Sequence, residues 1–290
     1  MHECRKKNIR LMKIPKKENR TVELLREHYK IEKELASRLR NASRDERRYL
    51  YSALYNELFR RVPHHPQLTC KKESELQLVA VSRQMKLLKS FLNSESVFIE
   101  VGPGDCSLSI EVAKHARKVY AIDVSEEITK GETFPQNFEL IISDGCSIPI
   151  PENTANIAYS KDLMEHLHPD DAIAQLQNIY KALTCGGKYI CITPNRLSGP
   201  HDISKYFNNV ATGFHLKEYT ATELSKLFYK IGFSKISAYI GGKGIYMKFP
   251  LLPIKMCEKL LNVLPLSFRR RIAKLLPFEA LLGIIIVGTK

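Results

Sequence analysis

The chain lacks several features that would assign it to familiar classes of protein. Its 290 residues contain seven cysteines, an odd number, and none of them forms a C-x-x-C pair. This pattern predicts reduced thiols and disfavours a disulfide framework or a zinc site. The first residues lack the apolar core of a secretory signal, and the longest late apolar run, at 284–287, is far too short to cross a bilayer. We therefore expect a soluble, cytoplasmic protein.

Negative charge is scarce at two places, and the formal net charge is +14. Residues 1–50 carry 16 Lys/Arg against 8 Asp/Glu, residues 243–275 carry 8 Lys/Arg against one Glu, and residues 51–242 are nearly neutral. Nucleic-acid binders usually place positive charge along their working groove, so the neutral middle disfavours a nucleic-acid partner. The basic, leucine-containing segment 245–275 is a candidate either for peripheral membrane contact or for a solvated helix pair that covers the sheet edge.

Apolar periodicity predicts alternating helices and strands after an N-terminal helical region. Strands separated by helices of this length favour a mostly parallel sheet with right-handed crossovers. The predicted helices are 42–62, 73–93, 106–117, 162–184 and 221–232, with two short ones within 245–280. The predicted strands are 96–102, 119–123, 138–143, 156–160, 188–193, 235–240 and 283–288.

The turn after the first predicted strand contains Gly102 and Gly104, which allow a ligand to approach the backbone closely. A dinucleotide fingerprint would need a third glycine where Ser107 stands, and this disfavours a nicotinamide-dependent oxidoreductase. Glu100, just before the turn, suits a cationic ammonium group better than a phosphate. The turn therefore predicts a ligand that carries an amino acid and no phosphate.

Acidic residues also close the next two predicted strands. Asp123 ends the second strand, where a carboxylate can accept both hydroxyls of a ribose. Asp144 and Gly145 follow the third strand, where an Asp can accept from an adenine amino group. Each acid alone could be a helix N-cap. An ordered set on successive strand ends instead predicts one nucleoside ligand.

Together these motifs resemble the class I S-adenosylmethionine (SAM)-dependent methyltransferases, and the similarity covers about residues 95–240 and the last strand. It rests on FIEVGPGDCSLS, VYAIDVS, the Asp-Gly after the third strand, IAYSKDLMEHLHPDD and LTCGGKYICITPN. It is strongest to the broad small-molecule group that contains ubiquinone-biosynthesis O-methyltransferases, in which many members have a third glycine where Cys106 stands. The resemblance implies a Rossmann-like α/β sheet of seven strands in the order 3-2-1-4-5-7-6, with the seventh antiparallel. It also implies SAM as cofactor, with Ser160 on the fourth strand among the residues that bind it.

On this basis we expect residues 1–94 to form a basic arm and an N-terminal helical lid, and residues 95–290 to form the SAM-binding domain with a helical insertion before the last strand. Segments 195–220 and 243–282 would lie on the acceptor side. His64 and His65 could reach the pocket from the lid.

Proton transfer from an acceptor hydroxyl would need a base. Asp162, Glu165 and His166 are spaced to share one side of the predicted helix 162–184, so His166 could act as the base with either acid orienting it. Ubiquinone-type enzymes carry a similar Glu-x-x-Glu-His cluster implicated in metal binding. The three residues could therefore hold a divalent ion, although a metal is not expected, or could simply pack the cofactor pocket. His215 is a rival base or a structural residue.

The sequence therefore favours methyl transfer to a small-molecule acceptor, most simply a hydroxyl oxygen of a natural product, a sugar, a quinone or a lipid-linked precursor. RNA or protein methylation is the enzymatic alternative. A SAM-binding partner module without turnover is the alternative from another class.

Overall fold

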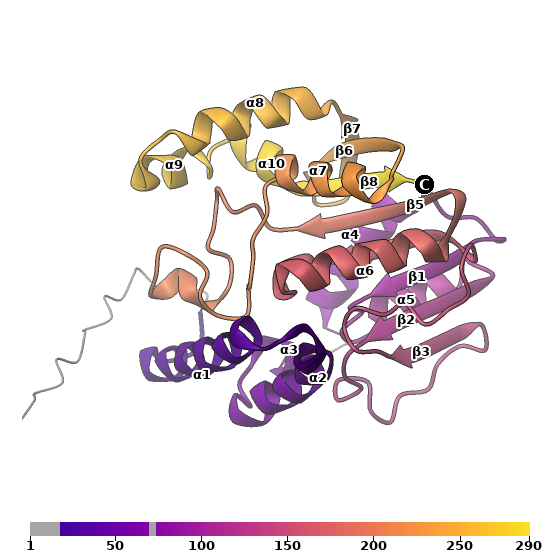
Figure 1. The fold of residues 1–290 in the computed structure, drawn as a ribbon, viewed down its shortest axis with the longest axis horizontal. Helices are drawn as coiled ribbons and strands as arrows, with labels where there is room; N and C mark the ends of the chain where they lie inside the picture. Colours follow the sequence, from indigo (N-terminus) through magenta and orange to yellow (C-terminus); the bar gives the residue numbers. More distant parts are fainter. Residues whose placement is uncertain (1–17, 70–73) are drawn as a thin grey trace, which may run out of the picture.

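The computed structural model describes residues 18–69 and 74–290, which form one mixed sheet flanked by helices (Figure 1). The predictions that fall on residues 1–17 and 70–73, including the first part of the basic arm, Cys4 and Cys70, lie outside the described residues. The strands are β1 (Val97–Val101), β2 (Lys118–Asp123), β3 (Phe138–Ile142), β4 (Ala155–Lys161), β5 (Leu183–Thr193), β6 (Lys235–Gly242), β7 (Ile245–Phe249) and β8 (Ile284–Thr289). The α-helices are α1 (Val22–Asn41), α2 (Arg44–Arg61), α3 (Pro66–Thr69), α4 (Glu75–Leu88), α5 (Ser107–Ala113), α6 (Pro169–Ala182), α7 (Ala221–Ile231), α8 (Leu251–Asn262), α9 (Leu266–Ile272) and α10 (Phe278–Leu282).

The strand order is β3-β2-β1-β4-β5-β8-β6-β7. Strands β1 to β5 pair in parallel, and β8 lies antiparallel between β5 and β6. The predicted Rossmann-like order and the antiparallel last strand are thus confirmed. The predicted count of seven was one too few for the part of the chain that the structure describes, because β7 pairs with β6 at the edge. A two-residue turn at Lys243 and Gly244, both with positive φ, closes this hairpin.

The helix predicted at 162–184 begins later than expected. Met164–His166 is a single 3-10 turn, and α6 starts at Pro169, with His168 as its N-cap. Proline is favoured at the first position of a helix because its fixed φ suits the helix and its missing N–H is not needed there. The expectation that Asp162, Glu165 and His166 share one side of a helix was therefore wrong.

Apolar side chains on the two faces of the sheet pack against different helices. Val97, Ile99 and Val101 of β1 face a core shared with α1, α2, α6 and α7, whereas Phe98 faces a second core with α4 and α5. Figure 1 shows α6 in front of the sheet and α4 and α5 behind it. Helices therefore cover both faces of the parallel strands, and the carboxyl ends of the strands stay accessible to ligands.

Helix α2 is fastened to α6 by a buried polar cluster. The Arg47 guanidinium donates to both carboxylate oxygens of Asp171, with 2.9 Å for the Nη2–Oδ1 contact. The Tyr51 hydroxyl donates to the same carboxylate at 2.8 Å and accepts the backbone amide of His168 at 2.9 Å. The N-terminal helices are thereby held over the carboxyl ends of the strands.

The insertion between β6 and β8 contains the β7 strand and helices α8 to α10, one strand and one helix more than the two short helices expected. Its helix α8 packs against α7 and α10. Within residues 18–69 and 74–290, none of the helices is both long enough and apolar enough to cross a membrane.

Candidate functional site

A cavity lies at the carboxyl ends of β1 to β4 and is covered by α2. The loops that follow the four strands and the face of α2 toward the sheet contribute to its wall, including Gly102, Gly104, Asp123, Gly145, His166, Tyr51 and Tyr55. We call it the first cavity. In open α/β sheets this edge is where ligands bind.

The predicted glycine turn forms one wall of the first cavity. Gly102 and Gly104 have φ of +72° and +58°, in the region that favours glycine. A Cβ added at Gly104 would meet no atom within 4 Å, so the backbone there is open to a ligand. Cys106, which stands where many related enzymes have glycine, adopts φ +60° and is buried. The turn thus keeps a left-handed backbone without the third glycine.

Asp123 ends β2 with its carboxylate beside this turn. It accepts the backbone amides of Val124 at 2.7 Å and Gly104 at 3.3 Å, and burial raises its pKa above the ordinary value. The contacts fix the carboxylate at the wall of the first cavity, where it can accept hydroxyl groups of a ligand.

Asp144 has other partners. Its carboxylate accepts the amides of Ser147 at 2.7 Å and Cys146 at 2.9 Å, and pairs with Arg48 of α2 at 2.8 Å. Burial raises its pKa, but these amides and the guanidinium outweigh burial and hold the pKa at about 2. Asp144 shapes the loop that presents Gly145 to the first cavity. Its assignment to the adenine stays a prediction.

Two other predicted cofactor residues are buried within the sheet. The Ser160 hydroxyl shares a hydrogen bond of 2.6 Å with the Tyr189 hydroxyl. The Glu100 carboxyl accepts the hydroxyl of Ser109, on α5. Burial raises the pKa of Glu100 to about 8, so this carboxyl is largely protonated at neutral pH. Cofactor binding by Ser160 and Glu100 stays a prediction.

Replacing Glu100 with glutamine should remove a pH dependence of stability. The pKa of Glu100 is raised from 4.5 to about 8 in the folded chain. The contribution of Glu100 to the free energy of unfolding is therefore full below pH 4.5 and is lost as the pH rises through 8. Relative to Glu100→Gln, the free energy of unfolding of the wild type should fall by about 1.4 kcal/mol per pH unit across this window. Urea unfolding of both proteins at a series of pH values measures the difference. Parallel curves would show that Glu100 is ionised in the fold.

The 3-10 turn after β4 carries Glu165 and His166, and Asp162 precedes it. The Glu165 carboxylate accepts the Thr193 hydroxyl at 2.8 Å, and its other oxygen is buried with no partner among the described residues. Burial raises the pKa of Glu165 to about 8. Asp162 is exposed and pairs with the neighbouring Lys161. The structure therefore shows neither acid orienting His166.

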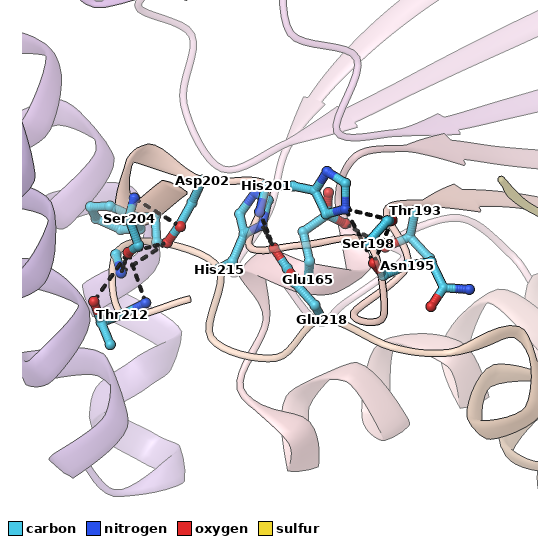
Figure 2. A network of polar contacts seen from close by, with 12 residues as sticks. Glu165, Thr193, Asn195, Ser198, His201, Asp202, Ser204, Thr212, His215 and Glu218 are labelled. Carbon is cyan, nitrogen blue, oxygen red and sulfur yellow. Dashed lines mark hydrogen bonds and ion pairs between the residues drawn. The ribbon is translucent and has the colours of Figure 1, made fainter. Parts of the chain in front are cut away.

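His166 instead lies against His215, with ring centroids 4.8 Å apart. The Nδ1 of His215 pairs with Glu218 at 2.8 Å, and Glu218 also accepts the amide of His201 at 2.7 Å (Figure 2). The Nδ1 of His166 is buried without a partner in the described part of the chain. Desolvation lowers the pKa of both rings, for His166 to about 3, with His215 adding to the effect. Both imidazoles are thus neutral at physiological pH.

A second cavity adjoins the first on the other side of His166. Tyr55, Gln67 and His166 line both cavities. The remaining wall of the second cavity comes from α1 and α2, the segment before α3, and the segment after β5: Glu32, Leu58, His65, Asp202, Phe214 and His215. Of the two histidines that could reach a pocket, His65 lines this cavity; Glu32, Tyr55 and Asp202 were not predicted.

The expected acceptor-side segments differ in their position at this cavity. Segment 195–220 supplies part of the wall, whereas the described residues around the cavity include none from 243–282. That insertion instead supports the segment from outside. Glu258 of α8 accepts from Asn195, and Arg270 of α9 donates to the carbonyl oxygen of Gly199.

The side chains Glu165, His166 and His215 also have the donor atoms of a metal site. One ligand atom from each lies within 4.8 Å of the others. His28, Glu32 and His65 make a similar group, although the Nε2 of His28 already pairs with Glu32 at 2.7 Å. The set that the structure brings together contains His215 in place of the predicted Asp162.

Residues 99–191 match the family model described as a methyltransferase domain, and this stretch contains the glycine turn, Asp123 and His166. This match assigns a methyltransferase domain to residues 99–191. No curated protein matches the sequence. The fold of this methyltransferase is similar to that of phosphoethanolamine N-methyltransferase 1 from Haemonchus contortus, solved with phosphoethanolamine and S-adenosylhomocysteine, with 14% identity over 86% of this chain and 50% of that chain (TM-score 0.54). It is also similar to SAM-dependent methyltransferases of Thermotoga maritima (14% identity, 83% and 98% covered, TM-score 0.51) and Archaeoglobus fulgidus (15% identity, 83% and 100% covered, TM-score 0.50).

The first cavity fits the cofactor of this methyltransferase. The open backbone at Gly104 and the fixed carboxylate of Asp123 are the features that a nucleoside carrying an amino acid needs. SAM supplies a methyl group already activated by its sulfonium. The protein then has to align the acceptor, exclude water and receive any proton that the acceptor loses.

Proposed function

We propose that this methyltransferase methylates a small molecule held in the second cavity, and that the methylated atom is a hydroxyl oxygen. The observation that carries the proposal is that the two cavities meet at His166. A cofactor in the first cavity and an acceptor in the second would face each other across this side chain. Helices α1 and α2 then act as the lid that covers both compartments.

The neutral histidines at the junction suit a hydroxyl acceptor. The Nδ1 of His166 is buried without a partner among the described residues. The ring is neutral because desolvation lowers its pKa to about 3, so it has a lone pair that can accept a hydrogen bond from an acceptor hydroxyl. His215, oriented by Glu218 through Nδ1, is the second group that can receive or relay a proton. The aromatic rings of Tyr55 and Phe214, with centroids 5.2 Å apart, supply an apolar wall. They help to keep water away from the transfer.

An amine is the second candidate acceptor, because the second cavity also contains carboxyl groups. Glu32 is buried there, and although burial raises its pKa, pairing with His28 lowers the pKa below the ordinary value, which keeps Glu32 ionised. An ammonium group would be attracted to this carboxylate. The similar protein from Haemonchus contortus acts on phosphoethanolamine, as its name states. Incubating the enzyme and SAM with matched hydroxyl and amino compounds, followed by mass spectrometry of the products, separates the two candidates.

Replacing Asp123 with alanine should weaken binding of S-adenosylhomocysteine by about 100-fold, since hydrogen bonds to a charged group contribute roughly 1.5–3 kcal/mol each. Isothermal titration calorimetry measures the loss. Glu126→Ala, in the exposed part of the same loop, is the matched control and should bind as the wild type does. Equal affinities for Asp123→Ala and the wild type would exclude Asp123 from the cofactor site. Binding of a nicotinamide cofactor in place of the homocysteine derivative would overturn the proposal as a whole.

A further inference from the structure

Helix α8 carries a row of exposed apolar side chains. Leu252, Met256, Leu260 and Val263 follow one another at intervals of three or four residues and are between 59% and 75% exposed. Its opposite side is buried through Ile254, Cys257, Glu258 and Leu261. Three or four residues make about one helical turn, so the exposed row is a continuous stripe on one face.

Exposed apolar side chains also occur in and after α9. Phe268, Leu275 and Leu276 are 54%, 58% and 79% exposed. Single exposed apolar residues are ordinary on protein surfaces, but contiguous apolar surface marks an interaction site. We call α8, α9 and the residues to 276 the α8–α9 surface.

The charge of the α8–α9 surface is almost entirely positive. Residues 251–276 contain six Lys/Arg and a single acid, Glu258. Glu258 is buried and is used inside the protein, where it accepts from Asn195 and from the amides of Ala221 and Thr222. Lys259, Arg271 and Lys274 are exposed. No acidic side chain of this segment therefore offsets the cations at the surface.

We propose that the α8–α9 surface docks on an anionic lipid bilayer. A helix with an apolar stripe and flanking cations lies in a membrane interface, with its apolar side chains among the acyl chains and its cations at anionic headgroups. A nucleic-acid backbone would pair with the cations but would leave the apolar stripe exposed to water. An anionic bilayer would bury the exposed apolar side chains and would also pair with the cations.

Hydrogen bonds connect the α8–α9 surface to the segment that lines the second cavity. Arg270 of α9 donates to the carbonyl oxygens of Gly199 at 3.0 Å and Asn209 at 2.6 Å. Those two residues belong to segment 195–220, which also supplies Asp202 and Phe214 to the cavity wall. Docking would thus bring the segment that encloses the second cavity close to the bilayer.

The test is cosedimentation of the full chain with vesicles of phosphatidylcholine alone and of phosphatidylcholine mixed with phosphatidylglycerol. The wild type should bind the anionic vesicles, and added salt should weaken the binding. Leu252→Ser combined with Leu260→Ser, and separately Arg271→Glu combined with Lys274→Glu, should each lower the partition coefficient by about tenfold or more. Thermal unfolding followed by circular dichroism verifies that each variant is folded.

Matched controls use exposed residues elsewhere on the protein. Leu76→Ser with Leu78→Ser on α4 removes two leucines that are 81% and 62% exposed, and Arg26→Glu with Lys30→Glu on α1 reverses two exposed cations. Both controls should bind vesicles as the wild type does. Residues 1–17 are also basic and remain intact in every variant. Undiminished binding by the Leu252/Leu260 variant, equal losses in the controls, or binding to RNA with none to vesicles would each overturn the proposal.

Discussion

Replacing His166 with glutamine should lower kcat by about 10²- to 10⁴-fold, the range that general base catalysis contributes. The ring borders both cavities, and its Nδ1 is buried without a partner among the described residues. Glutamine keeps a polar side chain of similar size but cannot take up a proton near neutral pH. The measurement is steady-state turnover of whichever acceptor the wild type methylates in the screen.

His215→Gln is the comparison for this prediction. Because His215 lines the second cavity and is held by Glu218, its loss should act through the position of His166 and the acceptor, with a smaller effect on kcat. Binding of S-adenosylhomocysteine should stay within a few-fold of wild type in both variants. The low pKa of His166 also predicts that wild-type kcat will not fall with a midpoint near pH 6.5 as the solution is acidified. Full turnover by His166→Gln would exclude this histidine as the base.

Replacing Asp171 with alanine should lower the free energy of unfolding by about 3–5 kcal/mol, the usual cost of removing one partner of a buried ion pair. The carboxylate is 1% exposed and accepts hydrogen bonds from Arg47 and Tyr51. Its loss leaves a buried guanidinium and a buried hydroxyl without their acceptor. Chemical unfolding measures the change, and the melting temperature should fall by roughly ten degrees.

Asp170→Ala is the matched control, because Asp170 is the preceding residue on the same helix and is 72% exposed. It should change the free energy of unfolding by less than about 1 kcal/mol. Replacing the pair together, as Arg47→Met with Asp171→Leu, should restore part of the loss, since no charge then remains buried and unpaired. A loss of less than 1 kcal/mol in Asp171→Ala would show that α2 is held to α6 by its apolar contacts alone.

The strands of the sheet could be predicted because each is marked by residues that are close together in the sequence. Strands β1 to β3 are short runs with a glycine or an acidic residue at or just after their ends, and the chain order of those ends determined which loops would meet at Asp123 and Gly145. Two of the errors of secondary structure also had local signals. Pro169 marks the start of α6, and Lys243-Gly244 marks the hairpin that creates β7.

The partners of the site residues could not be predicted because they come from distant parts of the chain. Asp144 pairs with Arg48, 96 residues earlier, and the amide of Phe214 donates to Glu32 across 182 residues. No periodicity or spacing reports such contacts. The second cavity, which depends on α1 meeting segment 195–220, was therefore visible only in the folded structure.

The position of β8 in the sheet has a consequence for the order in which the protein can be assembled. This strand lies between β5 and β6, yet among the strands of the described residues it is the last along the chain. During synthesis β5 therefore has one unpaired edge, and the β6–β7 hairpin has no place to attach, until residues 284–289 have left the ribosome. An open strand edge is a template for pairing with other chains. The nascent methyltransferase is thus most exposed to misassembly just before its last strand closes the sheet.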